Sequence, residues 1–151
     1  MKKILFICCI LLLCGCSKKE EAKELLTDND FGFTVIVDDG KGLNIGFKIK
    51  NINEYIGDQY NESKKNKQTI YYNEHIQITL NNKNEIKKIE LLSNHYQIEG
   101  NIRIGQDQSL LDYNNHQEHN HQYIAYSENK TVKITYVLKE NIITKIILSE
   151  K

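Results

Sequence analysis

Three histidines lie close together near residue 120 and form the densest group of metal-ligand side chains in the chain. His116, His119 and His121 follow the spacing His-x-x-His-x-His. Imidazole nitrogens at this spacing can bind Zn²⁺ or Cu²⁺. The surrounding run 114–122 is almost wholly polar, and the similar run 61–67 contains no histidine. A solvated, variable loop explains both runs, so metal binding is an alternative hypothesis and no cofactor is expected.

Other groups that could carry catalysis are scarce. The chain has no Gly-x-Ser-x-Gly motif, and its four cysteines all lie within the first 16 residues. Asp28 and Asp30 are followed by Gly32 and Phe33 where a calcium loop needs a ligand and then a glycine. The run 38–42 lacks the Gly-Lys-Ser/Thr ending of a phosphate loop. The sequence therefore predicts a protein that is not an enzyme.

Tyrosine is the side-chain type that most favours a binding role. The chain has nine tyrosines, and several fall in predicted strands. Tyrosine combines a rigid apolar ring with a polar tip, which suits protein interfaces. Tyr71, Tyr72, Tyr123 and Tyr126 are the candidate partner surface. The alternative is that about half of them line the core.

The N-terminus has the pattern of an export signal. Lys2 and Lys3 precede an uninterrupted apolar run at 4–13. A helix of that length spans roughly 15 Å, about half of a bilayer core. The run therefore fits a signal peptide better than a transmembrane helix.

The run Leu13-Cys14-Gly15-Cys16 resembles the bacterial lipobox. The resemblance implies cleavage after Gly15 and a diacylglycerol on the Cys16 sulfur, with several acyl chains making the anchor stable. Residues 1–15 are then the signal peptide. The protein is expected at the cell membrane or outer membrane, anchored by lipid on the extracytoplasmic side. The alternative is an ordinary secretory signal.

Export also changes the charge of the chain. The full sequence has 20 basic and 20 acidic residues. Loss of residues 1–15 removes Lys2 and Lys3 and no acid, which leaves 18 basic against 20 acidic residues and a net charge of −2. Nucleic-acid binding needs a basic excess, so no nucleic-acid partner is expected. Residues 16–30 are rich in charge and poor in apolar side chains, and we interpret them as a lipidated cysteine and flexible tether.

Residues 31–151 contain a weak tandem repeat. Five short patterns recur in the same order at offsets of 59, 58, 54, 56 and 57 residues. The matched pairs are 42–46 with 101–105, 52–55 with 110–113, 70–72 with 124–126, 76–80 with 132–136 and 86–91 with 143–148. The repeat predicts a first unit at 31–93 and a second at 94–151.

Each unit is predicted to be a helix followed by a three-stranded antiparallel meander. Ile49, Ile52 and Ile56 fall at i, i+3 and i+7, as on one helix face, while Asp107 can cap a helix in the second unit. The alternating runs that follow are typical of strands. A unit of about 60 residues is marginal alone. We therefore expect an α+β fold in which the two units pack together and share a core or one continuous sheet.

An Ile-Gly step, a short helix and a meander ending in I-x-x-I-x-L resemble the small lipoprotein domains of the SmpA/OmlA (BamE-like) type. The tandem form resembles the β-lactamase-inhibitor-protein fold. These resemblances imply a protein-binding module, in envelope assembly or as an inhibitor.

Together these observations predict a lipid-anchored extracytoplasmic lipoprotein that acts as a non-catalytic protein- or peptide-binding module of the cell envelope. It would contact the membrane through the lipid on Cys16. Two alternatives stay open. One is a metal-binding or sensing lipoprotein that uses His116, His119 and His121, and the other is an inhibitor of a secreted enzyme.

Overall fold

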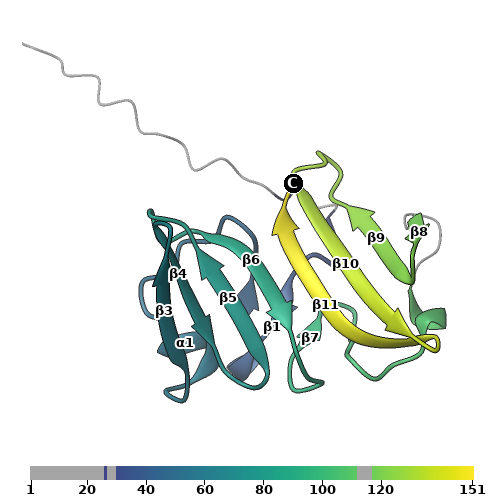
Figure 1. The fold of residues 1–151 in the computed structure, drawn as a ribbon, viewed down its shortest axis with the longest axis horizontal. Helices are drawn as coiled ribbons and strands as arrows, with labels where there is room; N and C mark the ends of the chain where they lie inside the picture. Colours follow the sequence, from purple (N-terminus) through teal and green to yellow (C-terminus); the bar gives the residue numbers. More distant parts are fainter. Residues whose placement is uncertain (1–25, 27–29, 112–116) are drawn as a thin grey trace, which may run out of the picture.

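The described part of the chain is built from two antiparallel sheets (Figure 1). The structure, a computed structural model, describes residue 26, residues 30–111 and residues 117–151. The large sheet has the strand order β3-β4-β5-β6-β11-β10-β9-β8, and the small sheet has the order β2-β1-β7. The strands are β1 (Val35–Ile36), β2 (Gly42–Leu43), β3 (Asn61–Lys65), β4 (Gln68–Tyr72), β5 (Ile76–Leu80), β6 (Ile86–Leu91), β7 (Gln97–Ile98), β8 (Gln117–His119), β9 (Gln122–Tyr126), β10 (Val132–Lys139) and β11 (Ile142–Glu150).

The predicted α+β fold of helix-plus-meander units is wrong, because the described chain is mostly strand. Its one α-helix, α1 (Asn53–Ile56), is four residues long, and two 3₁₀ turns accompany it: η1 (Asp38–Gly40) and η2 (Gln108–Leu110). Ile49, Ile52 and Ile56 are all buried, as their spacing suggests. Periodic burial does not require a helix, and α1 ends at Gly57, whose φ is +69°. A single turn gains too few hydrogen bonds to extend by itself.

In the second half, Asp107 does cap a turn. Its carboxylate accepts a hydrogen bond from the Ser109 backbone N–H at 2.8 Å. Hydrogen bonds from the backbone and side chain of Ser109 hold the pKa of Asp107 below its usual value. The turn is η2, however, which ends at Leu110 instead of continuing as an α-helix.

The polar run 61–67 is not a loop but the first strand and the turn of a β-hairpin, whose second strand is β4. It supplies β3 and the turn at Asn66 and Lys67, whose φ angles are +52° and +63°. Asn120 and His121, with φ of +47° and +62°, make the matching turn between β8 and β9. Two successive positive φ angles mark a type I′ turn, the two-residue hairpin connection that fits strand twist. Each meander therefore has four strands. The sequence hides β3 because all five of its residues are exposed and polar.

The two meanders join through β6 and β11 into one sheet. Ile89 pairs with Leu148, and Leu91 pairs with Ile146. The repeat makes Ile89 equivalent to Ile146 and Leu91 equivalent to Leu148, so each strand meets its own counterpart in reverse order. The join is thus a local twofold arrangement centred on the pair Glu90 and Ile147.

The two halves also make equivalent backbone contacts. The Gly46 N–H donates to the Ile86 carbonyl at 2.8 Å, and the Gly105 N–H donates to the Ile143 carbonyl at 2.8 Å. Both glycines have a positive φ, +85° and +90°. This backbone conformation favours glycine and explains why the Ile-Gly step occurs in each half.

The strand pairings show that one of the five matched pairs of the predicted repeat is aligned wrongly. Leu80 pairs with Ile86, and Leu138 pairs with Ile143, each directly after a β-bulge. Strand β5 therefore corresponds to residues 134–138 and not to 132–136. A shift of two residues keeps every side chain on the same face, so the apolar pattern could not reveal it.

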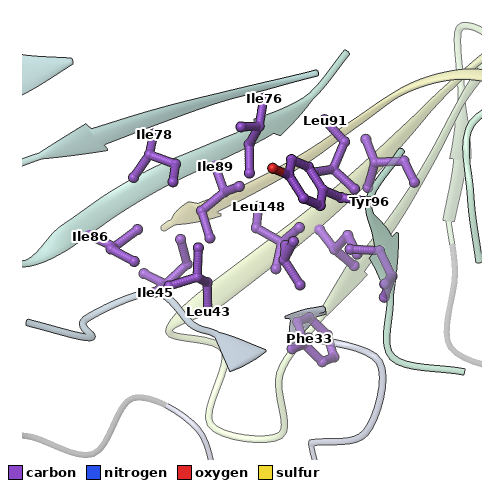
Figure 2. Close-up of a cluster of buried hydrophobic side chains, with 14 of the residues drawn as sticks. Phe33, Leu43, Ile45, Ile76, Ile78, Ile86, Ile89, Leu91, Tyr96 and Leu148 are labelled. Carbon is purple, nitrogen blue, oxygen red and sulfur yellow. The ribbon is translucent and has the colours of Figure 1, made fainter. Parts of the chain in front are cut away.

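The core lies between the large sheet and the small sheet, which Figure 1 shows behind it. We call the small sheet and the segments beside it, residues 30–57 and 96–111, the covering layer. In Figure 2, Leu43 and Ile45 of this layer lie close to Ile86, with Ile89 and Leu148 of the large sheet above them. Leu43, Ile89 and Leu148 are fully buried. Figure 1 shows the other described elements on this one side of the large sheet, and we call the opposite side the outer face.

Leu148→Ala should destabilise the whole protein, because the side chain is 0% exposed at the β6–β11 join. The expected loss in the free energy of unfolding is about 2–5 kcal/mol. Leu92→Ala is the matched control, since Leu92 is 39% exposed, and it should cost less than about 1 kcal/mol. Equal losses in urea unfolding for the two variants would contradict this placement of the core.

Candidate functional site

A row of side chains crosses the outer face from one half to the other. Directly paired residues of antiparallel strands project to the same side of a sheet. The pairings that run through the join therefore define one continuous row. It consists of Tyr72, Gln77, Glu90, Ile147, Thr135 and Ile124.

Several apolar side chains within this row and beside it are not fully buried. Ile70, Ile124, Val137 and Ile147 are half-buried. Tyr72 and Tyr126 are more open, with 39% and 38% of their surface exposed. Tyr126 pairs with Lys133, two residues from Thr135 of the row, so it also lies on the outer face. The face thus offers aliphatic surface in the middle strands and a tyrosine in each half.

The charges on the outer face are mainly positive. Glu90 is at the centre, with its side chain only 12% exposed and 3.0 Å from the Lys88 ammonium. The Lys145 ammonium lies 4.0 Å from the same carboxylate, and the Gln77 amide donates to it at 2.9 Å. The registers add two further lysines to this side of the sheet, Lys65 and Lys133. Among the described strand residues, four lysines against one glutamate make this face basic.

The four tyrosines predicted as a partner surface lie on two different faces. Tyr72 and Tyr126 are on the outer face, whereas Tyr71 and Tyr123 project toward the covering layer. Tyr123 is only 4% exposed and belongs to the core. Neighbouring strand residues point to opposite faces, so Tyr71 and Tyr72 cannot both serve one surface.

Tyr71 lies at the border of the core on β4. Its ring meets that of Tyr60 edge-on, with 5.4 Å between the ring centres. Burial, together with the nearby Glu62 carboxylate, raises the pKa of Tyr71. The phenol therefore stays neutral under ordinary conditions.

The histidine motif is only partly described. His116 and the side chain of His119 lie outside the described residues, while the backbone of His119 ends β8. His121 is exposed in the β8–β9 turn, where its carbonyl accepts from the Leu138 N–H at 2.8 Å. Within residues 30–111 and 120–151, no group of three or more His, Cys, Asp or Glu side chains is arranged to hold a metal ion.

A second pair of histidines, His75 and His95, is not marked by any local sequence motif. The rings of His75 and His95 stack, with centres 4.3 Å apart and planes 12° apart. His95 Nε2 lies 3.5 Å from the Asp38 carboxylate, and His75 Nδ1 lies 2.9 Å from the Ser93 hydroxyl. His75, His95 and Asp38 line a polar cavity of about 410 Å³. Twenty residues separate the two histidines, and only the start of β5 and the segment after β6 bring them together.

Tyr96 also lines this cavity. Its ring meets that of His95 edge-on at 4.6 Å, and its hydroxyl donates to Asp38 at 3.4 Å. Burial is the main cause that raises the pKa of Tyr96 to about 12, with the charge of Asp38 and this hydrogen bond as further causes.

The lipidation site lies outside the described residues, as do residues 1–15 and most of the tether. Two residues assigned to the tether belong to the folded body. Leu26 packs against the core, and Asp30 is buried, with its carboxylate accepting from the Glu128 N–H at 2.6 Å. None of the helices in the described chain is long and apolar enough to span a bilayer.

Comparison of the chain with protein-family models, with curated proteins and with solved structures gives no match. The likeness to SmpA/OmlA-type domains and to the β-lactamase-inhibitor-protein fold therefore stays a prediction from the sequence.

Tyr96→Phe should make the protein less sensitive to alkaline pH. The raised pKa favours the neutral phenol in the folded state, so its contribution is complete below pH 10 and is lost as the pH rises toward about 12. The wild-type Tm should fall between pH 9.5 and 11.5, and the variant's Tm should fall less. Parallel Tm curves for the two proteins would show that Tyr96 does not couple to folding.

Proposed function

We propose that this protein is a lipid-anchored lipoprotein on the extracytoplasmic side of the membrane, and that it binds a protein or peptide partner without catalysing a reaction. The observation that carries the proposal is the outer face of the large sheet. It combines exposed Tyr72 and Tyr126 with half-buried Ile124 and Ile147, and the other described elements lie on the opposite side of the sheet (Figure 1).

The size of the face supports a macromolecular partner. Eight strands at a spacing of about 4.8 Å extend roughly 34 Å across. Strands of five residues are about 17 Å long. The resulting area is on the order of 600 Å², close to the roughly 800 Å² that each partner contributes to a standard protein interface.

The positive charge of the outer face indicates which kind of partner it would bind. Lys88 and Lys145 lie beside Glu90, and Lys65 and Lys133 lie on the same face further out. Complementary charge guides association and selects partners. The partner we propose is therefore a protein or peptide with an apolar centre and acidic residues around it.

Photocrosslinking in cells tests this surface directly. p-Benzoylphenylalanine at Tyr72 or at Tyr126 should give one discrete adduct, because both rings point outward from the sheet. Phe47 is the matched control, since it is aromatic, 41% exposed and part of the layer on the other side. An equal adduct from the Phe47 position, or none from either tyrosine position, would contradict the proposal.

The captured partner must then bind through the same face when purified. Lys133→Glu combined with Lys145→Glu should weaken its binding by about tenfold or more, because both changes put a negative charge opposite an acidic partner. Lys83→Glu, in the exposed turn after β5, is the control that changes charge elsewhere. Equal affinities for the two variants would show that the outer face is not the binding surface.

The anchor can be tested separately. Cys16→Ser removes the sulfur to which diacylglycerol would be attached. The variant should leave the membrane fraction and should lose the label from an alkyne analogue of palmitate, while the Cys14→Ser control keeps both. Unchanged membrane association of the Cys16→Ser variant would contradict lipid anchoring at this residue.

A further inference from the structure

A cavity of about 800 Å³ opens on the covered side of the second half. Ala125, Ile134 and Tyr136 from β9 and β10 line its floor. Phe31 and Leu110 also line it, and they are 70% and 57% exposed. Exposed apolar side chains that gather beside a cavity are typical of a binding site. The volume lies within the range of sites for small organic molecules.

The walls of the cavity are held in place by specific contacts. The Glu99 carboxylate accepts from the Gly32 N–H at 3.2 Å, and the Asp30 carboxylate accepts from the Glu128 N–H at 2.6 Å. A Cβ on Gly100 would come within 3.1 Å of the Phe31 ring, so glycine allows that ring to lie against the backbone. The site is thus formed before any ligand arrives.

The polar groups of the cavity have one sign of charge. Asp30, Glu99 and Glu128 line it, and none of the described lining residues is Lys, Arg or His. Carboxylates with no basic residue beside them in the described lining favour a positively charged ligand.

We propose that this cavity binds a small organic amine. The apolar, aromatic body of the amine would contact the exposed Phe31 and Leu110, above the buried side chains of Ala125, Ile134 and Tyr136, and its ammonium would lie near the carboxylates of Glu99 and Glu128. The cavity carries the opposite charge from the outer face, and apart from Tyr126, which borders both, the two sites are formed by different residues.

The test uses 4-phenylbutylamine, 4-phenylbutanol and 4-phenylbutyrate, which share one apolar body and differ in charge. The chain has only two alanines, Ala22 and Ala125, so ¹³C-methyl alanine labelling of the full chain in detergent micelles gives a simple spectrum. The amine should shift the Ala125 signal and bind at least about tenfold more tightly than the acid, with the alcohol between them. An unshifted Ala125 signal, or an acid that binds as tightly as the amine, would overturn the proposal.

Charge-neutral variants locate the ammonium. Glu99→Gln and Glu128→Gln, made separately, should each weaken binding of the amine several-fold and leave binding of the alcohol unchanged. Glu99→Gln keeps an oxygen that can accept from Gly32, so its fold is expected to be preserved. Glu74→Gln, an exposed carboxylate on the rim of the histidine cavity, is the matched control. Amine affinity that is unchanged in both Glu99→Gln and Glu128→Gln would also overturn the proposal.

Discussion

The pairing of β6 with β11 is the interaction on which the rest of the structure depends. Without it, the chain would hold two four-stranded meanders, each with an apolar strand at its edge. Ile89 and Leu91 meet Leu148 and Ile146 there, and all four side chains are fully buried. Unpaired apolar edges of this kind promote aggregation, and their mutual pairing removes two of them. The remaining edges are β8 and the polar, lysine-bearing β3, which suits a solvent-exposed edge.

The same pairing creates the outer face. Glu90 and Ile147 lie directly opposite each other, and the row of side chains that reaches Tyr72 on one side and Ile124 on the other passes through them. One strand pair thus fixes both the core on the covered side and the continuity of the surface on the outer side. The basic outer face and the acidic cavity carry opposite charges, and Tyr126 borders both of them.

The sequence predicted the parts of this fold that depend on repeated local patterns. The Ile-Gly steps at Gly46 and Gly105 make the same hydrogen bond in both halves, and Asp107 caps a turn as expected. The helices were over-predicted, because buried isoleucines at helical spacing also suit an irregular segment packed on a sheet. Strand β3 was missed because an exposed edge strand needs no apolar residue.

The candidate site was less accessible to sequence reasoning. Tyrosines were a sensible choice, yet which of two adjacent tyrosines faces outward depends on register, and register depends on pairings between distant strands. The stacked His75 and His95 and the acidic cavity around Glu99 depend likewise on contacts between segments far apart in the chain. No local pattern could have revealed them.

Native-state hydrogen exchange tests the central claim, that the two meanders form one cooperative sheet through β6 and β11. Amides of β5 and β10, which lie on either side of the join, should exchange with the same free energy of opening, equal to that of global unfolding. Destabilising one half by mutation should lower both values equally. Two distinct free energies, with one half opening while the other stays protected, would contradict the account.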